Sequence, residues 1–306
     1  MIYRKKLKTH IYLFTILLTF LNSHLIQAQT DSVQYKRLTS FPVLTFNNFG
    51  YVKSGYQTPL GSGNIKMSEF NTSFQLAYKL KEKKLYLFNK ILLGQFNFSN
   101  EFNDTKMDER FSSVAISTGL IVALKNRWKL ISVVTPTLAS DFEKKVSSDD
   151  FLTQASVIAA KRTSPFCEYG FGLALTTRFG RELLIPLATL TYKKNNWTTL
   201  MILPAYLSQY YEINNTKIGL KMSIFGNLYN LSNPPNDNIE MDKLGYSRIT
   251  IGPDISTKLF GNFYLNFNAG LAVRNKLESI NTNKQVEMEL STKEKFFFNI
   301  GISLLK

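Results

Sequence analysis

A strict alternation of apolar and polar residues along the stretch "GNFYLNFNAGLAVRNKL" constrains the fold of this chain more than any other feature. Between Gly261 and Leu277, the apolar series begins at Phe263 and Leu265 and occupies every second residue up to Val273. This period predicts a β-strand with one apolar and one polar face. Whether the apolar face contacts a protein core or lipid decides what the chain is able to do.

Segments with the same period recur through the chain, and no segment of comparable length shows a helical period of 3.6 residues. The recurring segments are 69–80, 113–124, 167–179, 248–259 and 296–304. The sequence therefore predicts an all-β chain.

The connections between these segments are of two lengths. The short ones are 81–84, 125–127, 194–196 and 261–262, and the longer polar ones are 99–108, 141–149, 230–244 and 278–291. Short turns on one side and long loops on the other are typical of outer-membrane barrels.

The strand count follows from parity. If the short turns share one side, an even number of strands must lie between Trp197 and Leu259. Counting one strand for each alternating segment in this stretch gives three strands, which is an odd number. We therefore expect a bend at Leu203–Pro204, because proline removes a ladder donor. The whole chain then forms about 12–14 strands, within the known range for barrels.

The first 28 residues have the composition of an export signal. Basic residues Arg4, Lys5, Lys6 and Lys8 precede the apolar run "IYLFTILLTFL", and Ala28 marks a plausible cleavage point. We expect a cleaved signal peptide over 1–28, a short N-terminal segment over 29–40 and a barrel over 41–306. The expected location is the cell outer membrane.

Histidine is missing from the expected mature chain, because His10 and His24 both lie in the predicted signal peptide. This removes Ser-His-Asp and Cys-His catalysis and histidine-ligated zinc. Cys167 is the one cysteine, so no intramolecular disulfide forms. The adjacent acids Asp149 and Asp150 lie in a loop and are expected to be solvated. We predict no enzyme activity, no cofactor and no metal site.

Two architectures fit the alternation: a soluble β-sandwich and a single antiparallel transmembrane β-barrel. The long segments, the glycine-rich polar faces and the export signal favour the barrel. Charged residues on a lipid face cost about 2–4 kcal/mol at the bilayer midplane. Asp254 shares a face with Arg248 and Lys258, so that face is expected to line the lumen and the apolar face to contact outer-membrane lipid.

Aromatic residues directly after short turns are expected to anchor the barrel at the membrane–water interface. These residues are Trp128, Trp197, Tyr86 and Tyr264.

The expected lumen face is mainly basic. Its candidate lining residues are Arg178, Lys217, Lys221, Arg248, Lys258 and Arg274, with Glu168 and Asp254 as acids. This set predicts a passive small-solute channel that prefers anions. The same opposite charges are also compatible with a closed ion-pair network that seals the lumen.

A third possibility is a surface barrel that binds a partner through loops 230–244 and 278–291, although nothing in these loops identifies a protein partner. The formal net charge is +15, but it is dispersed over strands and turns and is not gathered in one stripe. Nucleic-acid binding is therefore not expected.

Four stretches of the chain resemble a family of uncharacterised outer-membrane β-barrel proteins of Gram-negative bacteria, described as a domain of unknown function. They are "SSDDF" (147–151), "IPLATLTYKKNNW" (185–197), "LP" (203–204) and "INNTKIGLKM" (213–222). The resemblance spans roughly residues 140–300. It implies a barrel fold and an outer-membrane location, and it supplies no catalytic residues.

Overall fold

The computed structural model describes residues 42–305 with the exception of 59–60, 82–83, 103–104, 233–241 and 292–294. The predicted signal peptide and the segment 29–40 lie outside the described residues.

The described residues form β-strands joined by turns and two short 3₁₀ segments. The strands are β1 (Pro42–Tyr51), β2 (Ser54–Thr58), β3 (Gly61–Lys81), β4 (Leu85–Phe102), β5 (Thr105–Ala123), β6 (Trp128–Ser140), β7 (Phe151–Arg162), β8 (Cys167–Thr176), β9 (Leu183–Lys194), β10 (Trp197–Leu203), β11 (Tyr206–Ile213), β12 (Thr216–Asn230), β13 (Lys243–Phe260), β14 (Phe263–Ile280), β15 (Val286–Ser291) and β16 (Lys295–Leu305). The 3₁₀ segments are η1 (Lys125–Arg127) and η2 (Ser148–Asp150).

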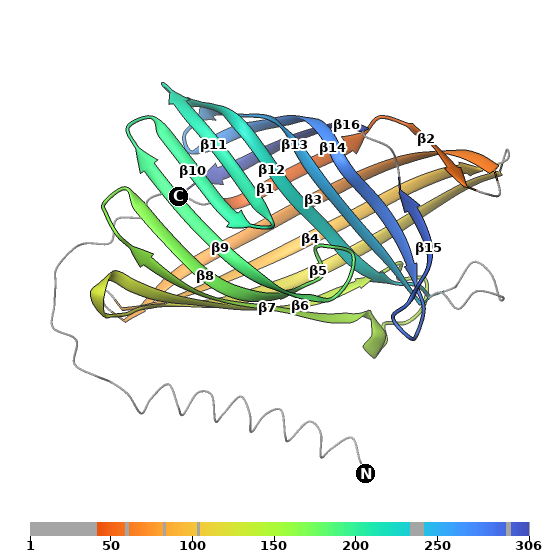
Figure 1. The fold of residues 1–306 in the computed structure, drawn as a ribbon, viewed down its shortest axis with the longest axis horizontal. Helices are drawn as coiled ribbons and strands as arrows, with labels where there is room; N and C mark the ends of the chain where they lie inside the picture. Colours follow the sequence, from red (N-terminus) through yellow and green to blue (C-terminus); the bar gives the residue numbers. More distant parts are fainter. Residues whose placement is uncertain are drawn as a thin grey trace, which may run out of the picture. The chain divides into compact units, whose positions relative to one another are not determined.

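The strands close into one antiparallel barrel (Figure 1). β1 pairs with β3 on one side and with β16 on the other, which joins the two ends of the chain. β2 and β15 extend this ring along β3 and β14, so fourteen strands form the closed wall. The predicted all-β barrel is confirmed, at the upper end of the predicted strand range.

The turns at one end of the barrel are tight because asparagine or glycine adopts a left-handed conformation there. Asn195, Asn214 and Gly261 have φ values of 53°, 53° and 50°, a region that these residue types tolerate best. The predicted bend at Leu203–Pro204 lies at the opposite end, between β10 and β11. Parity therefore places the short predicted turns together at one end, the turn end, and the longer connections, 141–150, 177–182 and 231–242, at the other, the loop end. The predicted loops 99–108 and 278–291 instead consist largely of strand, at the ends of β4, β5 and β14 and in β15.

Strand length varies strongly around the barrel. β3 has 21 residues and β13 has 18, whereas β10 has 7 and β11 has 8. In Figure 1 the β10–β11 hairpin ends partway along the barrel, while β12, β13 and β14 continue toward the loop end. The wall is therefore low on the side formed by β10 and β11.

The outer surface of the barrel is apolar. Phe171, Leu173 and Ile300 are 63%, 55% and 48% exposed, and the same face of other strands carries further exposed apolar side chains. Alternate residues of the same strands face the interior and include most of the charged side chains. This separation explains the period of two in the sequence.

Candidate functional site: the barrel lumen

The interior is divided in two because β12 separates from its neighbour. Pairing between β11 and β12 stops at Tyr206 and Ser223. β12 then continues across the barrel until Asn230 pairs in parallel with Ser140 of β6. The Asn230 carbonyl accepts hydrogen bonds from the Ser140 hydroxyl at 3.2 Å and from the Asp141 N–H at 3.3 Å. The loop-end halves of the strands on either side thus enclose an upper chamber, and β8–β11 lie outside it.

A hydrophobic core fills the upper chamber. Phe96 is 1% exposed and stacks on Tyr246, with ring centroids 4.1 Å apart. Phe111 is also 1% exposed and contacts Tyr229 at 5.2 Å. The rest of this cluster consists of Phe49, Tyr51, Ile65, Met67, Phe98, Ala139, Leu152, Leu228, Ala272, Leu277, Ile280 and Phe297. A core packed in this way leaves no path for a solute through the upper chamber.

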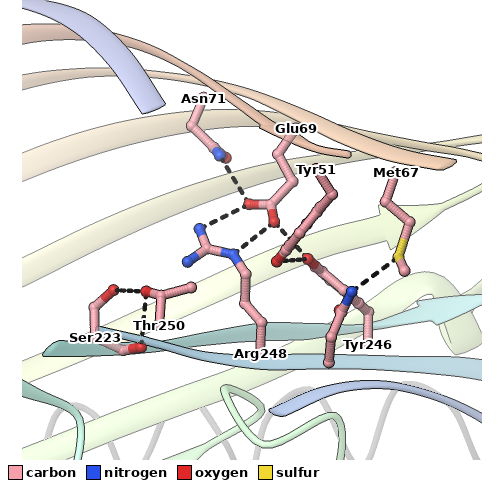
Figure 2. Close-up of polar contacts among 9 residues, drawn as sticks. Tyr51, Met67, Glu69, Asn71, Ser223, Tyr246, Arg248 and Thr250 are labelled. Atoms are coloured by element: carbon pink, nitrogen blue, oxygen red, sulfur yellow. Dashed lines mark hydrogen bonds and ion pairs between the residues drawn. The ribbon is translucent and has the colours of Figure 1, made fainter. Parts of the chain in front are cut away.

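An ion pair lies at the base of this core (Figure 2). Arg248 Nε donates to Glu69 Oε1 at 2.7 Å and its terminal nitrogen to Oε2 at 3.1 Å. The Tyr246 hydroxyl donates to the same carboxylate at 2.6 Å and contacts the Tyr51 hydroxyl at 2.9 Å. The guanidinium also stacks over Phe49 at 3.8 Å. The pair therefore connects β3 to β13 across the interior and separates the core from the space below.

The lower lumen, between this ion pair and the turn end, is polar. Lys221 pairs with Asp254 at 3.2 Å, and Tyr210 donates to the same carboxylate at 2.9 Å. Lys129 pairs with Glu168 at 2.6 Å. These contacts link neighbouring strands around the wall.

Basic residues exceed acids on the wall of the lower lumen. By strand register the basic residues are Lys79, Lys90, Lys129, Arg162, Lys193, Lys217, Lys221 and Lys258, and the acids are Glu168, Glu212 and Asp254. Positive charge is therefore in excess on the inner surface.

The connection between β8 and β9, residues 177–182, lies inside the barrel, and we call it the inner loop. It folds against the face of β12 and β13 that points away from the upper chamber. Gly226 and Gly245 permit this approach because neither carries a Cβ. A Cβ at Gly226 would lie 2.4 Å from the Arg178 carbonyl oxygen, and a Cβ at Gly245 would lie 2.3 Å from the Gly180 carbonyl oxygen. The Thr177 hydroxyl donates to Asn227 Oδ1 at 3.3 Å. The inner loop thus occupies the space between β12 and the low wall.

Two contacts hold the far end of the inner loop. The Arg181 guanidinium forms a bidentate ion pair with Glu278 of β14, one bond of which measures 3.1 Å. Lys284 pairs with Glu182 at 3.3 Å. The Arg178 backbone lies against Gly226, the neighbour of Phe225, whose ring contacts the Arg248 guanidinium at 4.8 Å. The inner loop therefore places a cation close to the base of the core.

Most of the predicted lining residues lie on the lumen face. Lys217, Lys221, Asp254 and Lys258 share the inner register, and Glu168 lies opposite Arg162 on the same face. Arg248 also faces inward, but it belongs to the base of the core and not to an open wall. Arg178 lies in the inner loop and not on a strand.

Arg274 differs from the prediction. The register between β13 and β14 shifts at this point, so that Arg274 pairs with Ile249 and Ala272 with Thr250. Val273 forms the extra residue of a bulge, and Arg274 consequently lies on the outer face. A bulge of this kind reverses the facing of every residue on one side of it, which strict alternation cannot anticipate.

The four expected interface anchors divide into two pairs. Trp197 is 49% exposed on the outer face and contacts Tyr211 at 4.9 Å, and Trp128 lies under Lys161 on the same face. Tyr86 and Tyr264 instead pair with the inward-facing Lys79 and Lys258. The prediction used only their position after a turn, whereas register parity places both tyrosines inside the barrel.

Asp150 also differs from its expectation as a solvated loop residue. It is 4% exposed, accepts the Ser147 N–H at 2.7 Å and accepts from Asn230 Nδ2 at 2.9 Å. Burial opposes its ionisation, but hydrogen bonds from Ser147, Ser140 and Asn230 outweigh burial and lower its pKa below the ordinary 3.8. Asp150 therefore fastens the β6–β7 loop to the end of β12.

Reasoning from the sequence missed Glu69 and the aromatic residues of the upper chamber. The signal that pointed to them is strand length: β3, β4 and β5 have 21, 18 and 19 residues, well beyond the roughly 9–11 that span a bilayer. Within the described ranges, no group of three or more acidic or cysteine residues is arranged to hold a metal ion. The same residues contain no helix long and apolar enough to cross a bilayer.

Solved structures similar to this chain include several membrane barrels. An outer membrane channel from Pseudomonas putida F1 is 11% identical, with 91% of this chain and 100% of that chain covered and a TM-score of 0.46. The TodX monoaromatic hydrocarbon channel is 8% identical, with 86% and 89% covered and a TM-score of 0.43. The NanC porin is 8% identical, with 85% and 98% covered and a TM-score of 0.34.

A comparison with curated proteins finds no match to this sequence. A family model matches residues 26–304, which is nearly the whole chain. The match includes residues from every strand of the barrel and confirms the resemblance noted in the sequence. The chain belongs to the family described as Domain of unknown function (DUF6268).

Proposed function

We propose that this protein is an outer-membrane channel for small solutes and that its lumen favours anions. The observation that carries the proposal is the excess of basic side chains on the inner face of the lower lumen. Such a surface raises the local concentration of anions and lowers that of cations.

The apolar outer surface supports a membrane location. Side chains such as Phe171, Leu173 and Ile300 form part of an exposed apolar surface that encircles the barrel. Contiguous apolar surfaces of this extent are rare on soluble monomers. In a bilayer this surface contacts lipid tails and not water, and the closed ring of strands satisfies backbone hydrogen bonds around the wall.

The expected route for a solute avoids the upper chamber. The aromatic core and the Glu69–Arg248 pair fill that chamber, so a solute entering from the turn end meets their underside. The remaining way out follows the low wall of β7–β11 and passes Arg178 in the inner loop. We therefore expect the inner loop to narrow this route and to influence its conductance.

The test is the conductance of the refolded chain, residues 29–306, in a planar bilayer under a salt gradient. Only preparations whose electrophoretic mobility changes on heating, as expected for a closed barrel, would be used. Discrete steps with a reversal potential biased toward anions are the expected result. A folded barrel that passes no current would overturn the channel and leave a lumen sealed by ion pairs, and a cation bias would overturn the anion preference.

A further inference from the structure

A cavity of about 140 Å³ opens above the aromatic core at the loop end of the barrel; we call it the mouth pocket. Its floor is formed by Phe98, Phe111 and Leu277, which are 9%, 1% and 4% exposed. The rings of Phe98 and Phe111 are parallel, with an interplanar angle of 1° and centroids 6.2 Å apart. The floor is therefore apolar and part of the packed core.

Two methionines stand at the sides of the mouth pocket. Met107 on β5 and Met288 on β15 are 39% and 45% exposed and line the cavity from different strands. Methionine is flexible and polarizable, and it contacts aromatic rings favourably. The side walls can thus adjust to an apolar guest while the floor stays fixed.

Three carboxylates complete the lining: Glu109 of β5 and Asp141 and Glu143 of the β6–β7 loop. Asp141 is held in place, because its carboxylate accepts the Ser232 N–H at 2.7 Å and the Glu143 N–H at 3.2 Å. No lysine or arginine lines the mouth pocket within the described residues. One side of the mouth pocket is therefore negatively charged, although its floor is apolar.

We propose that the mouth pocket binds a small hydrophobic cation, an ammonium group attached to an apolar body about the size of a phenyl ring. A dry cavity of about 150 Å³ accommodates benzene, which matches the volume here. The apolar body contacts the phenylalanine floor and the methionines, and the ammonium group faces the three carboxylates. The site lies above the Glu69–Arg248 pair and is separate from the proposed anion route.

The test uses phenethylammonium as the probe and the refolded barrel in lipid nanodiscs, with methionine methyl groups labelled for NMR. The resonances of Met107 and Met288 are expected to shift on titration. Met201, which lies on β10 outside the pocket, serves as the internal control. Phenylacetate, with a similar ring and the opposite charge, is expected to bind at least about tenfold more weakly because the carboxylates repel it.

Two isosteric variants test the charged side. Glu109→Gln and Glu143→Gln are each expected to weaken phenethylammonium binding several-fold, whereas Asp149→Asn, which removes a loop acid outside the pocket, leaves it unchanged. An unshifted Met201 resonance shows that each variant is folded. Equal binding of phenylacetate, shifts that do not single out Met107 and Met288, or full affinity in both glutamine variants would each overturn the site. Conductance of the channel does not enter this readout, so the two proposals fail or stand separately.

Discussion

Glu69 on β3 and Arg248 on β13 form a bidentate ion pair across the barrel interior, although 179 residues separate them in sequence. Their side chains are 1% and 8% exposed. Two buried charges compensate each other only when both are present, and loss of one partner leaves the other buried and unpaired. The pair therefore fixes the distance between β3 and β13, which β1, β16 and β14 separate in the wall.

We expect Arg248→Met to lower the free energy of unfolding by about 3–5 kcal/mol, the range for breaking a buried ion pair from one side. The measurement is urea unfolding of the barrel in lipid vesicles, followed by tryptophan fluorescence. The double variant Glu69→Leu/Arg248→Met is expected to recover part of this loss, because no isolated charge remains. Lys53→Ala is the matched control: its pair with Glu101 is exposed and is expected to contribute at most about 1 kcal/mol.

The inner loop gives a second prediction. Arg181→Ala removes the bidentate contact with Glu278 and frees the far end of the loop from β14. Single-channel conductance is expected to rise, or to become noisier, since the loop borders the proposed route. Lys106→Ala breaks an exposed ion pair of β5 and should leave conductance unchanged. Identical conductance in Arg181→Ala and the parent would show that the loop does not border the conducting path.

The strand pattern was predictable from the sequence because burial on one face imposes a period of two that survives in the amino acids themselves. The bend at Leu203–Pro204 was predictable for a similar reason, since proline is excluded from ladder positions. Parity then assigned each turn to one end of the barrel. All of these inferences depend on local rules, which a single sequence contains.

The arrangement of the lumen was not predictable because it depends on contacts between distant strands. Glu69 occupies the same place in the alternation whether it faces open water or Arg248, and only the folded barrel brings β3 and β13 close enough for the two residues to pair. Arg274 shows the same limit on a smaller scale, because one bulge changes its face without altering the local composition. Tyr86 and Tyr264 needed the register, which position after a turn does not give.

Asp150 predicts a pH dependence at the loop end. Hydrogen bonds from Ser147 and Asn230 favour its ionised form, so its pKa in the folded protein lies below the ordinary 3.8. A group with a lowered folded-state pKa adds stability above its unfolded pKa and loses it as the pH falls through the folded value. We expect the amide protection factors of residues 147–151, which correct for the slower intrinsic exchange in acid, to fall below about pH 4.

The variant Asp150→Asn is the control for this dependence. It keeps the size of the side chain but cannot titrate, so exchange in 147–151 should already be faster at neutral pH and should lack the acid transition. An acid transition of the same size in Asp150→Asn would assign the titration to another group.

Charge reversal in the lower lumen tests the anion preference directly. Lys90 and Lys217 are chosen because both face the interior by register and neither belongs to the ion pairs of the described residues. The double variant Lys90→Glu/Lys217→Glu changes the wall charge by four units and is expected to move the reversal potential toward cation selectivity. Arg274→Glu reverses a charge on the outer face, where the bulge places it, and should leave selectivity as in the parent. If both variants shift the reversal potential equally, selectivity arises from the general field of the protein and not from its lumen wall. A shift confined to the lysine variant assigns selectivity to the inner face.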